Sequence, residues 1–454
     1  MRCRWWVILL LLLLSCCSGS MCSEQQQQLV SRIAFGSCAN QSAPQPIWDA
    51  IIRFDPQVFI WMGDNIYGDI RRPFKLFGKE RTIGPWKNVP RFYPCSELEM
   101  KSRYLKAKNV PGYSNLTRSK TKVIGTWDDH DYGLNDAGKE FQNKITNQRL
   151  LLDFLDEPRA SPRRKQAGVY ASYIFGPVGK HVKIILLDTR YHRDPLSSDG
   201  SILGDAQWMW LERELKGPPT TITIIVSSIQ VISNHSATTG PLFYPESWGR
   251  FPREKSRLFK LLSHSKRKGV FFLSGDVHFG EIARYNCAAD YPLYEITSSG
   301  LTQAVEKAVS PPLHFVVRFL AWLTPAIMRV KDKSCRYCSC TYGQPNFGTI
   351  EINWDSDPVG LKFAIRDEKG LPAIALKLPL SELQGQKMDS QMTIGLGKFQ
   401  KYCSLEVDLP WFVRYRLAIF FFSTLAVLLL ATIGLLLCAV RSCCKRCYCK
   451  YKHD

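Results

Sequence analysis

The chain has no internal repeat, and neither its apolar fraction of 45% nor its charged fraction of 22% departs from that of ordinary globular proteins. The lack of a repeat excludes a repeat array, and the ordinary composition excludes a chain that is disordered throughout. Acidic residues are scarce beside basic ones, at 40 against 60, so the formal net charge is +20. At 454 residues the chain is longer than one simple core needs.

The two ends of the chain differ from the rest. Residues 1–22 place two arginines before an apolar run and then small residues and cysteines, which is the order of a secretory signal peptide; an uncleaved signal anchor is the alternative. Residues 417–440 carry no charge and are long enough to cross a bilayer, and residues 441–454 form a basic, Cys-rich tail. Basic residues mark the cytoplasmic side of a span. We therefore expect a single-pass type I membrane protein of the secretory pathway or cell surface.

In this arrangement residues 28–385 form a lumenal or extracellular domain, and residues 386–416 form a juxtamembrane segment. Asn115 and Asn234 begin Asn-x-Ser/Thr sequences, which predicts a glycoprotein. Residues 313–330 are apolar but contain Arg318 and Arg329, so they predict either a helix lying in the membrane interface or a core helix. Basic residues gather in 71–122, which favours anionic ligands or lipid headgroups unless they form a solvated loop. Entry into the secretory pathway argues against nucleic acid as a partner.

Cysteines are the second indicator of compartment. Seven lie between the signal and the span: Cys38, Cys95, Cys287, Cys335, Cys338, Cys340 and Cys403. An oxidising compartment would pair six of these seven. We expect Cys38 to be the one left over. The spacing of Cys335, Cys338 and Cys340 suggests a zinc knuckle, but no second pair follows, so disulfides are favoured. The cysteines of the tail resemble juxtamembrane palmitoylation sites.

Buried strands alternate with helices along the middle of the chain. Apolar, β-branched runs predict strands over 31–36, 57–62, 122–126, 182–187, 221–227, 270–273, 293–297, 347–353, 361–366 and 373–378. Amphipathic patterns predict helices over 46–53, 139–155, 205–215 and 254–266. This alternation predicts an α/β fold, in which ligands gather beyond the carboxyl ends of strands.

Polar side chains fall at those strand ends. They are Cys38, Asp64, the stretch 128–130, the stretch 188–190 and the stretch 276–278. The densest stretch, 126–136, packs five carboxylate or amide side chains around His130. Acidic groups this close repel one another unless a cation lies among them, so a metal site is favoured over a solvated turn or a helix cap.

The residue types fit phosphoryl chemistry. Two metals a few ångströms apart can clamp the attacking and leaving oxygens of a phosphoryl centre, with a metal-bound hydroxide as nucleophile. Asp64 could bridge both ions, and His130 could protonate the leaving oxygen or hold the phosphate. Arg190 or Asn65 could pair with a phosphate oxygen, although Arg190 could instead pair with Asp188. Each candidate has a structural alternative: a turn for Asp64, a strand-end cap for Asp276 and His278, a disulfide for Cys38 and a core position for Tyr67.

Four segments resemble the ordered motifs of the alkaline phosphatase D (PhoD-like) family of calcineurin-like metallophosphoesterases. They are Ser37-Cys38, Gly63-Asp64-Asn65-Ile66-Tyr67-Gly68-Asp69, the run from Trp127 to Asp136, and Ser274-Gly275-Asp276-Val277-His278. Their order and spacing match over residues 33–353. The resemblance implies a β-sandwich flanked by helices and hydrolysis of phosphomonoesters or phosphodiesters at a binuclear site, with iron and calcium or another divalent ion.

By the same likeness, Cys38, Asp64, Tyr67 and Asp276 would hold an iron-type ion. The second position would fall to Asp64 and Asp129, with Asp128, Asn135 and His278 as further candidate ligands. The resulting expectation is a membrane-anchored metal-dependent phosphatase acting on a phosphate ester. The alternatives are a phospholipase or phosphodiesterase acting on lipid headgroups, and a catalytically silent metal-binding ectodomain.

Overall fold

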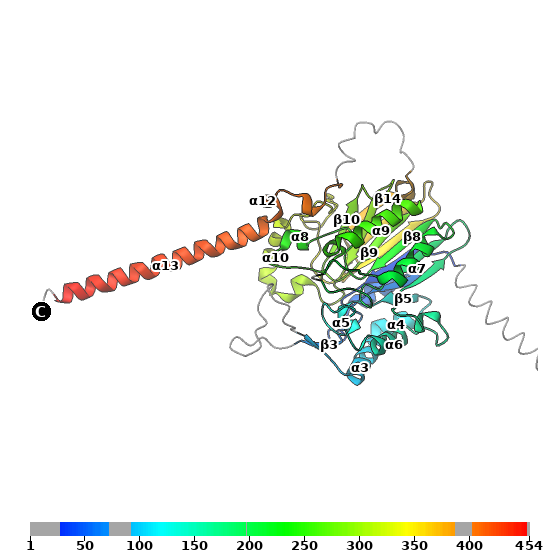
Figure 1. Ribbon diagram of the computed structural model, residues 1–454, viewed down its shortest axis with the longest axis horizontal. Helices are drawn as coiled ribbons and strands as arrows, with labels where there is room; N and C mark the ends of the chain where they lie inside the picture. The colour runs from blue at the N-terminus through cyan, green and yellow to red at the C-terminus, as the bar shows by residue number, and fades with distance from the viewer. Residues whose placement is uncertain (1–27, 72–91, 197, 386–401, 452–454) are drawn as a thin grey trace, which may run out of the picture.

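The computed structural model describes residues 28–71, 92–196, 198–385 and 402–451 (Figure 1). The expected signal peptide, residues 1–22, lies outside this part of the chain, as do residues 72–91 of the basic stretch 71–122. Two six-stranded sheets and their covering helices form the globular part, and one long helix projects from it (Figure 1).

The first sheet has the order β14-β13-β12-β1-β2-β5. Its strands are β1 (Arg32–Gly36), β2 (Val58–Met62), β5 (Lys122–Thr126), β12 (Asn346–Asn353), β13 (Gly360–Asp367) and β14 (Pro372–Pro379). β1, β2 and β5 run parallel, whereas β12, β13 and β14 add an antiparallel half. β2 is buried at every residue, as a central strand with both faces covered requires.

The second sheet has the order β10-β11-β9-β8-β7-β6. Its strands are β6 (Ala171–Phe175), β7 (Val182–Leu186), β8 (Ile222–Ser227), β9 (Val270–Ser274), β10 (Gly280–Tyr285) and β11 (Leu293–Ser298). β7, β8, β9 and β11 are parallel, and the two edge strands are antiparallel to their neighbours. All four parallel strands therefore end at the same edge.

The sheets pack face to face around one apolar core. Ile33, Ile60 and Ile365 of the first sheet share this core with Ile184 and Phe272 of the second. Helices α7 (Gly204–Lys216) and α9 (Pro252–Ser265) add residues to it from the outer face of the second sheet. The predicted α/β class and the sandwich implied by the resemblance are confirmed.

The outer face of the first sheet is covered by a second, aromatic cluster. Helices α2 (Ile47–Phe54), α3 (Glu97–Lys108), α4 (Pro111–Arg118) and α6 (Lys144–Phe154) supply it. Trp48 lies 5.5 Å, centroid to centroid, from Trp61 and 5.0 Å from Tyr113. Aromatic contacts of this kind add stabilisation beyond their buried area, so the parallel strands are fixed from both faces and hold their carboxyl ends in place.

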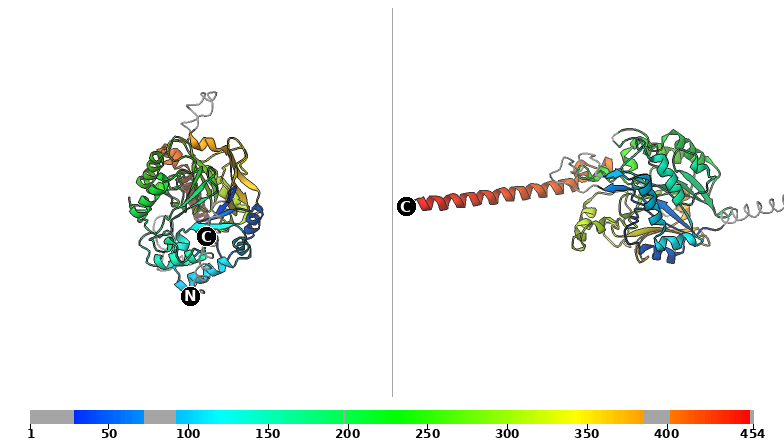
Figure 2. Two further views of the ribbon diagram at one scale, coloured as in Figure 1. Left: turned by 90° about the vertical axis from the view of Figure 1, so that its right-hand side faces the viewer. Right: turned by 90° about the horizontal axis from the view of Figure 1, so that it is seen from below.

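The chain ends in the helix α13 (Arg416–Tyr451), which projects from the globular part (Figures 1 and 2). Among the described residues, one helical segment, Arg416–Lys445, is long and apolar enough to cross a membrane. Leu417 and Ala418 are buried against the globular part, whereas the apolar side chains from Ile419 to Val440 are exposed. The helix continues into the basic tail as far as Tyr451.

The apolar stretch 313–330 forms the short helix α10 (His314–Leu323), and no residue of α10 is buried. The core-helix interpretation of this stretch is therefore wrong. Asn234, one of the two expected glycosylation sites, has only 7% of its surface exposed, and its carboxamide oxygen accepts a hydrogen bond from Ser236. A glycan does not fit there, whereas Asn115 is exposed on α4.

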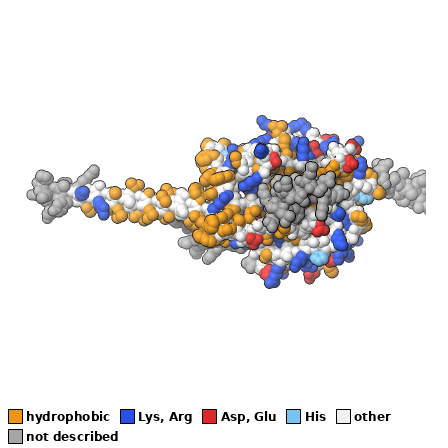
Figure 3. All heavy atoms as spheres, turned by 90° about the horizontal axis from the view of Figure 1, so that it is seen from above, with side chains coloured by type: hydrophobic (Ala, Val, Ile, Leu, Met, Phe, Trp, Pro, Cys, Tyr) orange, Lys and Arg blue, Asp and Glu red, His pale blue; other side chains and the backbone are white. Residues whose placement is uncertain are grey.

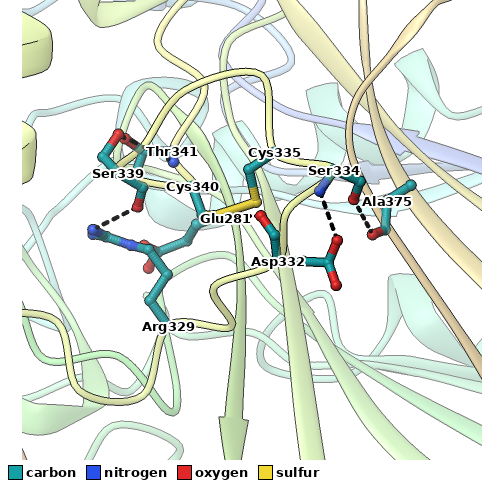
Figure 4. Close-up of a disulfide and its surroundings, with 9 residues drawn as sticks. All are labelled: Glu281, Arg329, Asp332, Ser334, Cys335, Ser339, Cys340, Thr341 and Ala375. Carbon is teal, nitrogen blue, oxygen red and sulfur yellow. Dashed lines mark hydrogen bonds and ion pairs between the residues drawn. A yellow bond between two sulfur atoms is a disulfide. The ribbon is translucent and has the colours of Figure 1, made fainter.

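Disulfides join fewer cysteines than expected. Cys287 pairs with Cys403, and Cys335 pairs with Cys340 (Figure 4). Cys38 is unbonded as predicted, but Cys95 and Cys338 are unbonded too, so the expectation of three pairs is wrong. The Cys335–Cys340 bond occupies two of the three sulfurs that suggested a zinc knuckle.

The Cys287–Cys403 bond ties the segment before α13 to the turn after β10, across 116 residues of chain. Closing so long a loop restricts the unfolded chain, so Cys403→Ser is expected to lower the free energy of unfolding by ~2–5 kcal/mol. Thermal unfolding of the full chain measures the effect. Cys338→Ser, at an exposed and unbonded position, is the matched control, and equal losses in the two variants would contradict the prediction.

Candidate metal centre

The loops after the parallel strands carry an unusual backbone. Cys38, Asp64, Asp276 and His278 all have positive φ, at 61°, 49°, 70° and 61°. Side-chain-bearing residues rarely adopt this conformation, and it concentrates where function requires a fixed geometry. Four of the candidate ligands therefore occupy strained positions at the strand ends.

A glycine before Asp64 makes room for a neighbouring loop. A Cβ at Gly63 would lie 2.5 Å from the Cβ of Asp128. Gly63 thus lets the loop after β2 approach the loop after β5, which brings two sets of candidate ligands together.

The first group of candidate ligands contains Cys38, Asp64 and His278, whose ligand atoms lie within 4.8 Å of one another. Cys38 Sγ is 3.4 Å from Asp64 Oδ2, and Tyr67 Oη is 3.1 Å from His278 Nε2. Burial and the charge of Asp64 raise the pKa of the Cys38 thiol. Burial and His130 lower the pKa of His278 to about 4, so its imidazole is neutral and able to bind a metal.

A second group shares Asp64 with the first. It contains Asp64, Asp129 and His130, and the next groups contain Asp128, Asp129 and Asp276, and then Asp129, Asp136 and Glu246. The groups overlap, so they form one continuous cluster in which Asp64 and Asp129 recur. Four of the five strand ends predicted to form a composite site supply candidate ligands to a single centre. The fifth, the stretch 188–190, supplies Arg190, which pairs with Asp128.

A bound cation would offset the burial and mutual repulsion of the carboxylates in this cluster. Burial raises the pKa of Asp64, of Asp276 and of Asp128, the last to about 6. Asp129 differs: burial alone would raise its pKa, but the charges of His130 and Arg190 hold it at about 2. Asp128 Oδ2 and Asn65 Oδ1 are buried oxygens without a hydrogen-bond partner among the described residues. Buried oxygens of this kind need a compensating group, and the residues fit bound cations.

Asp131 fixes the two loops that carry these ligands. Its Oδ1 accepts hydrogen bonds from the backbone N–H groups of Asp128 (2.6 Å) and Asp64 (3.2 Å). Its Oδ2 accepts from both the backbone and the side chain of Asn65. Asp131 therefore has a structural role that the acidic stretch did not reveal in the sequence.

Asn65 is placed differently from the expectation. Its side-chain NH₂ donates to Asp131 Oδ2 at 2.6 Å and to the Thr126 carbonyl at 3.0 Å. Both amide hydrogens are thus engaged, and the oxygen is the part that is unsatisfied. This arrangement offers a cation an acceptor and leaves no hydrogen for a phosphate.

The Arg190 side chain pairs with carboxylates other than Asp188, and its expected role toward phosphate stays a prediction. Its guanidinium lies 2.5 Å from Asp128 and also pairs with Glu246, whereas Asp188 accepts the backbone N–H of Arg190 at 2.9 Å. Arg190 is fully buried. Its positive charge therefore offsets the charges of Asp128 and Glu246 within the acidic cluster.

Glu246 is the residue that sequence reasoning missed. It lies in an irregular loop between α8 (Ser236–Thr239) and the 3-10 turn η2 (Trp248–Arg250) and pairs with Arg190 and Arg193. No apolar strand precedes it, so the strand-end pattern could not find it. Asp69 was quoted within a motif but given no role, and its Oδ1 lies 2.7 Å from His130 Nδ1.

Asn135, an expected ligand, is held near the cluster by its backbone, whose N–H donates to Asp69 Oδ2 at 2.9 Å. Tyr67 lies over the His130 ring, with ring centroids 4.3 Å apart. Every predicted site residue therefore lies in or beside one centre, and the individual roles stay predictions.

Comparison with known proteins agrees with this geometry. A family model described as PhoD-like phosphatase matches residues 33–315. Alkaline phosphatase D of Bacillus subtilis (strain 168) is 22% identical over 186 residues, which cover 34% of this chain and 30% of that protein, so the match spans under a third of the relative. A solved structure of PhoD has a TM-score of 0.53 at 14% identity, covering 78% of this chain and 69% of that one, which shows a shared fold. The family model covers more than half of the sequence, and the chain belongs to the PhoD-like phosphatase family.

Proposed function

We propose that this protein is a membrane-anchored, metal-dependent hydrolase of phosphate esters. The observation that carries the proposal is the continuous cluster of candidate ligands at the carboxyl ends of the strands, in which Asp64 belongs to two groups. Membership of the PhoD-like phosphatase family supports the reaction class.

The donor types suggest which ions the cluster holds. The Cys38 thiol, the Tyr67 phenol and the His278 imidazole suit an iron-type ion, and the carboxylates of Asp128 and Asp129 suit calcium or another hard divalent ion. Asp64, with Asp276, would contribute to both. Bound there, such ions would offset the charge of phosphate oxygens and lower the pKa of water.

His130 is the candidate general acid. Burial alone would lower its pKa, but Asp129, Asp64 and Asp69 outweigh burial and raise it well above the usual value. The imidazolium is therefore the form present at neutral pH in the metal-free chain. Asp69 holds Nδ1, which leaves Nε2 to give a proton to a leaving oxygen.

Arg190 and Asn65 support this chemistry by position. Arg190 pairs with Asp128 and so orients one candidate ligand. Asn65 fixes Asp131, which in turn holds the backbone of Asp64. Direct pairing of either residue with phosphate requires the side chain to leave its present partners.

Asp69→Asn tests the role of the His130–Asp69 pair. Without the charge of Asp69 the pKa of His130 falls, so the basic limb of the pH–rate profile moves to lower pH. We expect kcat to fall by up to roughly 100-fold, the lower end of what general acid catalysis contributes, because His130 itself remains. A fall in kcat with an unmoved basic limb would assign Asp69 a purely structural role.

The membrane part of the proposal rests on α13. Its apolar exposed residues and the basic residues that follow them suit a span with the tail in the cytoplasm. The globular part would then lie in the lumen or outside the cell, a location in which the disulfides Cys287–Cys403 and Cys335–Cys340 persist.

The direct test uses the full chain, purified in detergent. Its metal content would be measured, and a chromogenic phosphomonoester and phosphodiester would both be offered. Turnover with bound transition metal supports the proposal and ranks the two ester classes. Bound metal without turnover of either ester, or of lipid substrates, would instead identify a silent metal-binding ectodomain. Lipid headgroup esters belong in the panel because the exposed helix α10 contacts the base of α13.

A further inference from the structure

Apolar side chains gather around the base of α13. They are Phe315, Phe319 and Trp322 on α10, and Trp411 and Phe412 on α12 (Trp411–Arg414), and we call this set the apolar collar. Phe315 is 67% exposed and Trp411 69% exposed. Figure 3 shows hydrophobic side chains concentrated where the long helix leaves the globular part.

The collar is continuous with α13. The Phe319 ring lies 5.6 Å from the ring of Phe420, which is in the first exposed turn of α13. The guanidinium of Arg416 donates to the backbone carbonyls of Trp322 (2.8 Å) and Leu323. The end of α10 is thus fixed at the level where α13 becomes exposed.

We infer that the apolar collar lies in the interfacial layer of the bilayer that α13 enters. Helices with exposed Phe and Trp lie at this depth, and aromatic side chains are enriched there. α10 carries no carboxylate, and its one guanidinium, on Arg318, is paired with the buried Glu306 at 2.7 Å. The inference rests on the membrane anchoring proposed above and identifies which face of the globular part meets the membrane.

This face is connected to the metal centre from two sides. On one side, the backbone N–H of Val305, next to Glu306, donates to the carbonyl of His278 at 2.8 Å. On the other side, Arg414 donates to the carbonyl of Ala237 in α8 at 2.8 Å.

The chain that links α8 to the centre is short. Thr239, the last residue of α8, is followed seven residues later by Glu246. Seven residues span at most ~25 Å when fully extended. The collar is therefore joined to the metal centre by the two segments that carry His278 and Glu246.

The experiment is photo-crosslinking of the full chain in phospholipid nanodiscs. A benzophenone amino acid would replace Phe315 or Phe319, and adducts with phospholipid would be measured by mass spectrometry. Leu428 on α13 is the positive control. Met209, 61% exposed on the outer face of α7, is the matched helical control away from α13.

We expect lipid adducts at 315 and 319 at roughly ten times the yield at 209, and close to the yield at 428. Adducts at 428 but not at 315 or 319 would overturn the inference and leave the anchoring intact. Crosslinks from 315 or 319 to a second protein chain would also overturn it and assign the collar to a protein interface. Failure at 428 would remove the anchoring and the inference together, with ester hydrolysis in detergent unaffected.

Discussion

Asp64→Asn is expected to reduce ester hydrolysis by a factor of about 1,000 or more while the protein stays folded. Asp64 belongs to two overlapping groups of candidate ligands, with Cys38 and His278 on one side and Asp129 and His130 on the other. Loss of this carboxylate would weaken the binding of metal, whose charge would supply several kcal/mol of transition-state stabilisation, and each ~1.4 kcal/mol is a factor of ten in rate. The measurement is kcat/KM together with bound metal per chain.

The same substitution is expected to raise the stability of the metal-free protein. Burial and the charges of Asp129, Asp128 and Asp131 raise the pKa of Asp64, and His130 only partly offsets them. Ionised Asp64 is thus unfavourable without a cation, and asparagine removes that charge at nearly constant volume. Asp355→Asn, at an exposed turn, is the control. A metal-free variant less stable than the wild type would show that the Asp64 carboxylate has a structural role instead.

Removing the metals is expected to abolish turnover and to change how stability depends on pH. The pKa of Asp128 is raised by burial to about 6, against ~3.9 for an unfolded aspartate. Between these values the folded metal-free chain binds more protons than the unfolded chain. The stability that Asp128 contributes is therefore full below about pH 4 and is lost as the pH rises through about 6, and Asp64 and Asp276 contribute in the same direction.

The metal-loaded protein is expected to behave in the opposite way. Ligands must lose their protons to bind a cation, so metal affinity rises with pH. A cation at 1,000 times its Kd adds ~4 kcal/mol of stability. The difference in Tm between loaded and chelated protein should therefore widen from pH 5 to pH 7.5. A difference that stays constant over this range would mean that the acidic cluster does not bind the metal.

Regular elements were the part of the fold that sequence reasoning predicted well. β5 was predicted with its observed bounds, 122–126, and β7, β8 and β9 to within one residue at each end. These strands are apolar at nearly every position because both faces are covered. β6 and β10 were not predicted. β10 contains the charged residues Glu281 and Arg284, which interrupt the apolar pattern of a buried strand. Glu281 is compensated by Arg329, which comes from a distant part of the chain.

The candidate site shows the same division. Cys38, Asp64, Asp128 and Asp276 follow buried strands, so the strand pattern alone predicts that they lie together. Glu246 follows no strand and reaches the cluster through a long irregular loop. The sequence also could not predict the partners of Arg190. It pairs with both Asp128 and Glu246, which tertiary packing brings to it from distant parts of the chain.

The junction of α12 and α13 restricts how this enzyme could meet its substrate. Only Tyr415 separates the two helices, Leu417 and Ala418 are buried in the globular part, and α13 then continues without a break to Tyr451. If α13 spans the bilayer as proposed, its attachment without a flexible linker would fix the height and tilt of the globular part above the lipid. The enzyme would then search in two dimensions. Its turnover would follow the number of substrate molecules per unit area of membrane.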